Sequence, residues 1–196
     1  MELFELADYR ERVARMHLAD TDLAGFRRAR DELFATHPQS PVPPAERGGF
    51  AGLDYFPADP DAIVEAAPAP AAGTSTVDTG GPDGVITYRR LATLDTPYGR
   101  LTLFWIEAYG GGLFLPFRDG TAGTRTYGGG RYLTDTVKGT FGRGVRIDGG
   151  RVRLDFNYAY NPSCAYDPRW ACPLAPEENR LDAPVPAGER SYPPGS

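Results

Sequence analysis

Two blocks of the sequence hold most of the side chains that could carry chemistry. The first, LFLPFRDGTAGTRTYGGGRYL at residues 113–133, places arginines and hydroxyl groups between glycines. Glycine lets backbone N–H groups approach a ligand closely, and arginine supplies paired donors that match a carboxylate or phosphate. The pattern predicts a pocket for a small anion, in which Arg118, Thr126, Tyr127 and Arg131 bind the ligand.

The same block also has a purely structural interpretation. Arg118 could pair with Asp119, and Arg131 with Asp155, so that the two ion pairs fix a long glycine-rich connection. The block is neither a Walker loop nor a GxGxxG turn that opens a helix, so it contains no nucleotide-binding motif. Residue types alone slightly favour the structural interpretation.

The second block, DFNYAYNPSCAYDPRWACPLAPEENRL at residues 155–181, combines turn formers with aromatic side chains. Its asparagines and prolines predict successive turns, while its tyrosines and tryptophan provide packing surface. An aromatic wall beside an asparagine amide suits a planar ligand, which predicts that Asn157, Tyr160 and Trp170 line the pocket. A lid that seals one end of a sheet is an equally good interpretation.

Metal and redox chemistry are disfavoured by the cysteines and histidines. Cys164 and Cys172 stand in a C-x7-C spacing, whereas zinc sites use four ligands and closer cysteine pairs. His17 and His37, the two histidines of the chain, lie far away in the N-terminal region. A disulfide across this loop is sterically possible, but a reducing cytoplasm argues against it. We therefore expect no metal site and two buried thiols.

Few residues remain for proton transfer. A Ser-His-Asp or Cys-His triad would need a histidine from the N-terminal region, and nothing around either one indicates it. Carboxylates or tyrosines would then have to move the proton, and the candidates are Asp119 and Glu178.

Charge and hydropathy exclude two classes of partner. The net charge of −5 argues against nonspecific nucleic-acid binding, which needs a basic surface. The chain has no apolar run near the length of a membrane span, and its acidic, amphipathic N-terminus is unlike a signal peptide. These features predict a cytoplasmic protein that binds neither nucleic acid nor membranes. Lys138 is the single lysine among 21 basic residues.

Hydrophobic periodicity predicts an α+β fold. Residues 2–18 and 21–36 have the apolar spacing of helices, and Asp20 or Thr21 can cap the second. Alternating segments joined by tight turns then predict an antiparallel meander able to curl into a barrel. The expected strands are residues 62–66, 74–78, 85–94, 101–108, 113–117, 132–134, 145–147 and 151–156, and 67–73 is expected to be a mobile loop.

These elements predict a single domain over residues 1–196. Its parts are a helical region at 1–38, an irregular connector at 39–61, an antiparallel sheet at 62–157, a closing segment rich in proline and aromatic residues at 158–190, and a tail at 191–196.

The chain resembles domain-of-unknown-function family 1684, found in bacteria and archaea. The resemblance rests on the two blocks above, on SPVPPAERGGFAGLDYFPADP and on PAGER, and it spans nearly the whole chain. Gly129 departs from the alanine more usual there. The signature positions are Phe117, Arg118, Asp119, Thr121, Gly123, Thr126, Tyr127, Gly130, Arg131, Tyr132, Asp155, Phe156, Asn157, Ala159, Tyr160, Asn161, Pro162, Cys164, Cys172, Pro173, Glu178 and Asn179. The resemblance implies no activity, but it makes a pocket shared by the two blocks more plausible.

Three functional hypotheses follow. In the first, the two blocks form a pocket for a small carboxylate or phosphate ligand. In the second, they are structural, and the protein is an interaction module. In the third, a split-barrel-like sheet binds flavin; this rests on analogy of fold, and no other cofactor is expected.

Overall fold

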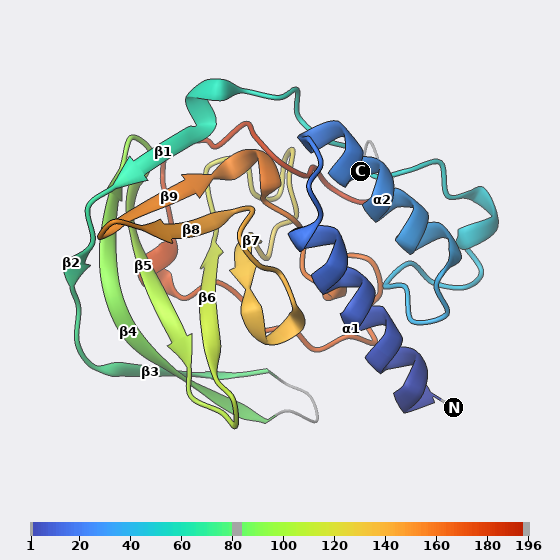
Figure 1. Ribbon diagram of the computed structural model, residues 1–196, viewed down its shortest axis with the longest axis horizontal. Coiled ribbons are helices and arrows are strands. Elements are labelled where there is room, and N and C mark those ends of the chain that lie inside the picture. Colours follow the sequence, from blue (N-terminus) through green and yellow to red (C-terminus); the bar gives the residue numbers. More distant parts are fainter. Residues whose placement is uncertain (1, 80–83, 194–196) are drawn as a thin grey trace.

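The computed structural model describes residues 2–79 and 84–193, and within these ranges it is an α+β structure (Figure 1). The helices are α1 (Glu2–Leu18) and α2 (Leu23–Thr36). The strands are β1 (Ile63–Ala66), β2 (Ala69–Pro70), β3 (Thr74–Asp78), β4 (Val85–Thr96), β5 (Gly99–Ile106), β6 (Gly112–Phe117), β7 (Arg131–Asp135), β8 (Val145–Asp148) and β9 (Arg151–Asp155). The predicted fold class is therefore confirmed.

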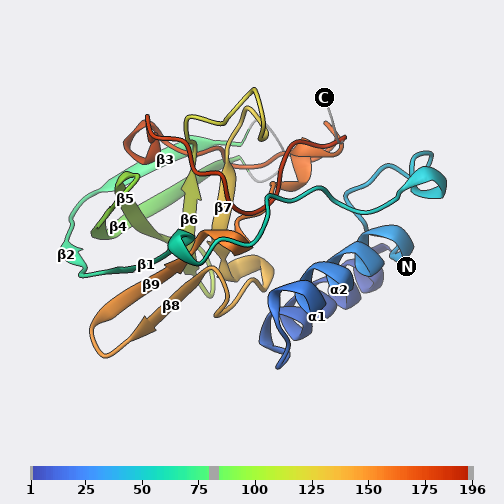
Figure 2. The same cartoon turned by 90° about the horizontal axis from the view of Figure 1, so that it is seen from above.

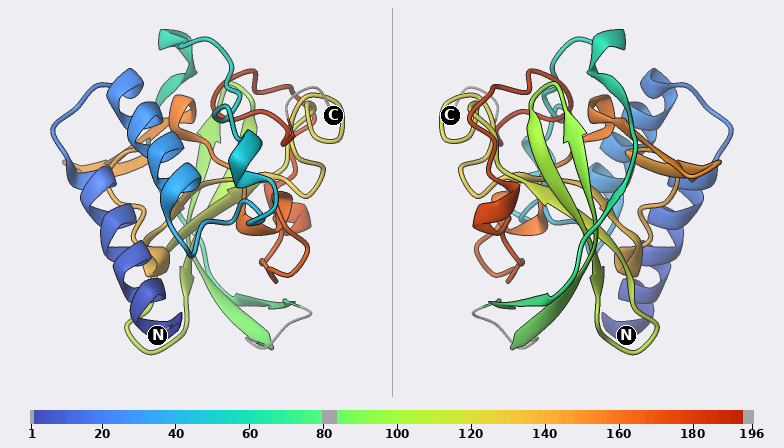
Figure 3. Two further views of the ribbon diagram at one scale, coloured as in Figure 1. Left: turned by 90° about the vertical axis from the view of Figure 1, so that its right-hand side faces the viewer. Right: turned by 90° about the vertical axis from the view of Figure 1, so that its left-hand side faces the viewer.

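The two helices lie side by side on one side of the molecule, away from β2 and β4 (Figures 1, 2 and 3). Helix α2 begins after Asp22, whose carboxylate accepts a hydrogen bond from the Gly25 N–H at 2.7 Å. The expectation that Asp20 or Thr21 caps this helix is wrong, because Asp22 reaches the free amide three residues later. No helix in the described ranges is both long and apolar enough to cross a membrane.

The strands form two antiparallel sheets instead of one meander. The smaller sheet has the order β1-β9-β8, and the larger has the order β2-β4-β5-β6-β7, with β3 also paired to β4. Strand β1 precedes the strands of the larger sheet in the chain but pairs with β9, about ninety residues later, from Ile63 opposite Asp155 to Ala66 opposite Val152. The larger sheet does not close into a barrel, and β2 occupies part of the segment expected to be a loop.

The main core lies between the two sheets. Leu94 and Leu115 of the larger sheet pack with Leu154 of the smaller one, and all three are fully buried. Because successive strand side chains point to opposite faces, Phe104 and Phe114 form a second cluster on the other face of the larger sheet. This second cluster includes Tyr132 of β7 and carries part of the candidate site.

The closing segment continues the edge of the larger sheet. Tyr160 and Tyr132 exchange backbone hydrogen bonds at 2.8 and 3.0 Å, so the segment pairs with β7. Its next residues pack on the helices, where Tyr166 meets Phe34 edge to face. Residues 160–172 thereby fill the space between β7 and the helix pair.

Two expected features lie outside the described residues. The predicted turn between β3 and β4 falls largely on residues 80–83, and the predicted tail includes residues 194–196.

Candidate functional site

Arg131 lies inside the protein and away from any ligand pocket. Its guanidinium pairs with the Asp119 carboxylate at 3.1 Å, and both side chains are almost completely buried. The same guanidinium donates hydrogen bonds to the carbonyl oxygens of Val185 at 2.9 Å and Glu189 at 3.1 Å, and to that of Ala187. Arg131 therefore fixes the end of the closing segment against β7.

Asp119 and Thr126 are also used within the protein. The Asp119 carboxylate accepts hydrogen bonds from the backbone and hydroxyl of Thr121 and from the Val185 N–H. The hydroxyl of Thr126 lies 2.9 Å from that of Thr121. This network fixes the glycine-rich loop. The ion pair in it is not the one considered from the sequence, because Arg131 pairs with Asp119 and not with Asp155.

Arg118 points to solvent, although its backbone is paired with residues 179 and 181. Within the described part of the chain, its guanidinium forms no hydrogen bond or ion pair, so the considered pairing with Asp119 is absent. Arg118 directly follows β6, and Arg131 is the first residue of β7, but the Arg118 side chain is exposed and the Arg131 side chain is buried. The structure does not bring them together as a clamp.

Three further predicted residues make structural contacts. The Asn157 amide bonds both to the backbone of Asp59 and to the Asp155 carboxylate, which ties the connector to β9. The Tyr127 hydroxyl donates to the Cys164 sulfur at 3.7 Å. Glu178 hydrogen-bonds to Arg90, which lowers the pKa of its carboxyl.

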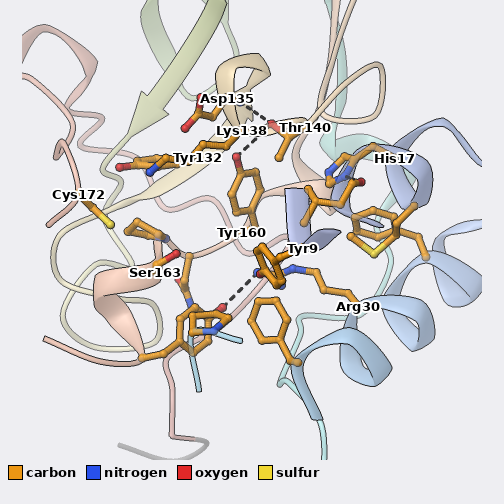
Figure 4. Close-up of a pocket in the computed structure, with 18 residues that line it drawn as sticks. Tyr9, His17, Arg30, Tyr132, Asp135, Lys138, Thr140, Tyr160, Ser163 and Cys172 are labelled. Carbon is orange, nitrogen blue, oxygen red and sulfur yellow. Dashed lines mark hydrogen bonds between the residues drawn. The ribbon is translucent and has the colours of Figure 1, made fainter. Parts of the chain in front are cut away.

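A cavity of about 80 Å³ lies between the helices, β7 and the closing segment; we call it the inner cavity (Figure 4). Tyr160 stands in its wall, with its hydroxyl 3.2 Å from that of Thr140. Arg30 and His17 extend into its lining from the helices, on the side opposite Cys172 (Figure 4). Its polar lining comprises Tyr9, His17, Arg30, Tyr132, Asp135, Lys138, Thr140, Tyr160, Asn161, Ser163, Tyr166 and Cys172.

Asp135 is the most unusual group in this lining. Its side chain is only 3% exposed, and its Oδ1 has no hydrogen-bond partner among the described residues. Burial raises the pKa of the carboxyl, although the nearby Lys138 charge and the backbone N–H groups of Val137 and Lys138 oppose the shift. A buried acceptor without a partner costs free energy unless a donor from water or a ligand reaches it.

The helices contribute two buried basic side chains, His17 and Arg30, to the lining of the inner cavity. Nδ1 of His17 lies 2.9 Å from the Val13 carbonyl oxygen, and burial lowers the pKa of the imidazole to about 4. Arg30 pairs with Glu189 at 2.6 Å; burial works against its charge, but the Glu189 carboxylate raises the pKa of Arg30 above its usual value. His17 is thus neutral at physiological pH, while Arg30 stays charged.

A wider hollow of about 370 Å³ adjoins the inner cavity; we call it the outer basin. The two share Tyr9, Lys138, Ser163 and Cys172 in their linings. The outer basin also has Arg10 from α1, together with Arg169 and Trp170 from the closing segment. Its lining therefore holds three cationic side chains and no carboxylate.

Of the residues predicted to bind a ligand, Tyr160 lines the inner cavity and Trp170 lines the outer basin. Arg118, Thr126, Tyr127, Arg131 and Asn157 line neither one. Sequence reasoning missed Arg10, Arg30 and Asp135, which come from the helices and from the end of β7. One signal was available for Arg30, because it interrupts the apolar stripe of α2 between Phe26 and Leu33.

Comparison with known proteins places the chain in a family. Residues 48–190 match the family described as "Protein of unknown function (DUF1684)". The chain belongs to this family. The matched range begins after α2, so it includes Lys138 and Trp170 but excludes Arg10 and Arg30.

A solved structure agrees with this assignment. An uncharacterised protein of Haloarcula marismortui, determined by solution NMR, is 40% identical to the chain, with a TM-score of 0.60. The similarity covers 86% of this chain and 92% of the archaeal one. No curated protein gives a significant match.

Proposed function

We propose that this protein binds a small carboxylate or phosphate ligand, with the anionic group in the outer basin and the rest of the ligand directed toward the inner cavity. The observation that carries this proposal is the lining of the basin, where Arg10, Lys138 and Arg169 converge without a carboxylate. Within the described residues, Arg10 and Lys138 form no ion pair, whereas Arg169 pairs with Asp167 at 3.0 Å. Two cations therefore remain available to an anion.

The charge of the basin contrasts with that of the chain. A protein with a net charge of −5 repels anions at long range, so a basin whose lining holds cations and no carboxylate provides a site that an anion can still enter. Arg10 offers a planar pair of N–H donors, and Lys138 adds a compact charge from the turn that follows β7. Trp170 provides a flat apolar surface beside them.

The inner cavity would receive a neutral, hydrogen-bonding part of the ligand. Asp135 lacks a partner at Oδ1, and the Tyr160 and Thr140 hydroxyls can both donate and accept. A ligand with a hydroxyl or amino group several bonds from its anionic end would satisfy Asp135. The flavin hypothesis gains no support from an open sheet, because it rested on analogy to a split barrel.

Thermal unfolding with phenyl phosphate and benzoate tests this function, and phenol serves as the neutral probe. At a concentration about a hundredfold above Kd, binding should raise Tm by about 5 to 10 °C. The double variant Arg10→Gln/Lys138→Gln should lose the shift, because both free cations are removed. Arg118→Gln is the matched control, since it removes an exposed arginine outside both cavities.

The outcomes separate the two candidate sites. A shift that survives in the double variant but disappears in Arg118→Gln would place the ligand at the glycine-rich loop. If neither anionic probe raises Tm more than phenol does, the proposed function is wrong.

A further inference from the structure

Two thiols meet in the closing segment beside the cavities. Cys164 lies in a 3-10 turn, Ser163–Ala165, and Cys172 follows eight residues later. Further turns fold the intervening chain back, with the Trp170 N–H bonded to the Asp167 carbonyl at 3.1 Å. As a result the Cys164 N–H donates a hydrogen bond to the Cys172 sulfur at 3.3 Å, and the two side chains lie close enough to shift each other's pKa.

The surroundings of the two sulfur atoms differ. The hydrogen bond from the Cys164 thiol lowers the pKa of Cys172 to about 7, with further help from the Cys164 N–H and from the charge of Lys138. The same sulfur–sulfur contact, together with burial, raises the pKa of Cys164. A thiolate is the nucleophilic form of cysteine, so the asymmetry makes Cys172 the attacking group and Cys164 its neighbour.

Cys172 can also be reached by a small molecule. Its residue is 8% exposed overall, but it lines both the outer basin and the inner cavity. A molecule the size of a hydroperoxide can therefore approach it through the basin. The Tyr127 hydroxyl donates its hydrogen bond to the Cys164 sulfur and not to the Cys172 sulfur.

We propose that Cys172 and Cys164 form a reversible dithiol–disulfide pair that is oxidised by a hydroperoxide. The Cys172 thiolate attacks one peroxide oxygen, the O–O bond breaks, and the leaving oxygen takes a proton as water or an alcohol. The sulfur becomes a sulfenic acid. The Cys164 sulfur then attacks the Cys172 sulfur, which forms the S–S bond and releases water. Both cysteines are oxidised and the peroxide is reduced; an external dithiol restores the pair.

This proposal is independent of anion binding, because it rests on the sulfur pair and on access to Cys172. Treating the reduced protein with one equivalent of hydrogen peroxide should remove both free thiols and two hydrogens, as measured by thiol titration and intact mass. Dithiothreitol should restore them. In Cys164→Ser the reaction should stop at a sulfenic acid on Cys172, which dimedone traps.

Alkylation by iodoacetamide provides a second readout. The groups that face the Cys172 sulfur are Cys164, Lys138, Tyr127 and Tyr132, and of these Lys138 alone is charged near neutrality. In the reduced wild type at neutral pH, peptide mapping should show that Cys172 is alkylated at least about tenfold faster than Cys164, since a pKa difference of one unit changes the thiolate fraction tenfold. Equal alkylation rates, or two free thiols that persist after peroxide treatment of the wild type, would overturn the proposal.

Discussion

The buried pair of Arg131 and Asp119 shows how a residue type can indicate the wrong role. Arginines beside glycines and hydroxyl groups are typical of anion sites, and Arg118 and Arg131 share that context in the sequence. In the structure the Arg131 side chain, at the start of β7, is buried. The Arg118 side chain, just after the end of β6, is exposed to solvent. Local composition predicts the donor groups, but it cannot predict which carboxylate or carbonyl groups will meet them.

Replacing Arg131 should therefore change stability and not binding alone. We expect Arg131→Met to lower the free energy of unfolding by about 3 to 5 kcal/mol, because the Asp119 carboxylate is left buried without its partner. Urea denaturation measures this change. Arg118→Met, the exposed counterpart, should change the free energy by less than about 0.5 kcal/mol. Similar losses in the two variants would contradict the structural role of Arg131.

His17 predicts a pH dependence of stability. Its folded pKa of about 4 lies below the usual value of 6.5, so between these values the unfolded chain binds a proton that the folded chain does not. Stability should therefore fall as the pH is lowered, with His17 accounting for about 2 to 3 kcal/mol between about pH 7 and pH 4.5.

The His17→Asn variant isolates this contribution, since the asparagine amide can still donate to the Val13 carbonyl. The difference in unfolding free energy between wild type and variant should narrow as the pH falls. Only the wild type loses the stability that comes from burying a neutral histidine. A difference that stays constant over that range would show that His17 is not buried in its neutral form.

At the scale of elements, local signals identify the helices and most strands well. The apolar stripe of α2 and the alternation in β4 are patterns of neighbouring residues, which a sequence displays directly. The partition into two sheets is not such a pattern, since β1 pairs with β9 across a separation of about ninety residues. The packing of α2 against the closing segment positions Arg30 beside Tyr160 and Tyr166. This long-range packing explains why the cavity was missed.

Asn179 links the closing segment to two neighbouring strands of the larger sheet, β5 and β6. Its amide, fully buried, bonds to the N–H and carbonyl of Thr102 in β5, at 2.6 and 2.9 Å, and to the Pro116 carbonyl in β6. Asn179→Ala should lower the free energy of unfolding by about 3 kcal/mol, because three backbone groups lose a buried partner. Chemical denaturation provides the measurement.

The neighbouring Glu178 supplies the control for this prediction. Its ion pair with Arg90 is about one quarter exposed, so Glu178→Gln should lower the free energy of unfolding by no more than about 1 kcal/mol. If Glu178→Gln proved more destabilising than Asn179→Ala, the assignment of Asn179 as the main link between β5, β6 and the closing segment would be wrong.

At the scale of the whole molecule, the two cavities lie where three separate parts of the chain meet. The helices provide Arg10 and Arg30, the end of β7 provides Asp135 with Lys138 just after it, and the closing segment provides Trp170. These parts are brought together only by the packing of the helix pair on the sheet edge. The hypothesis of an anionic ligand came from residue types alone, whereas the position of the cavities and most of the charged residues that line them required the assembled fold.

Lys138 offers the most direct measurement of the central claim, because it is the single lysine of the chain. Protein labelled with ¹⁵N-lysine should give one backbone amide resonance, that of Lys138, and one side-chain resonance. Titration with phenyl phosphate should shift both resonances along a saturating curve, and phenol should leave them unchanged. If phenyl phosphate leaves the Lys138 resonances in place at concentrations that stabilise the protein, the anion binds elsewhere and the account is contradicted.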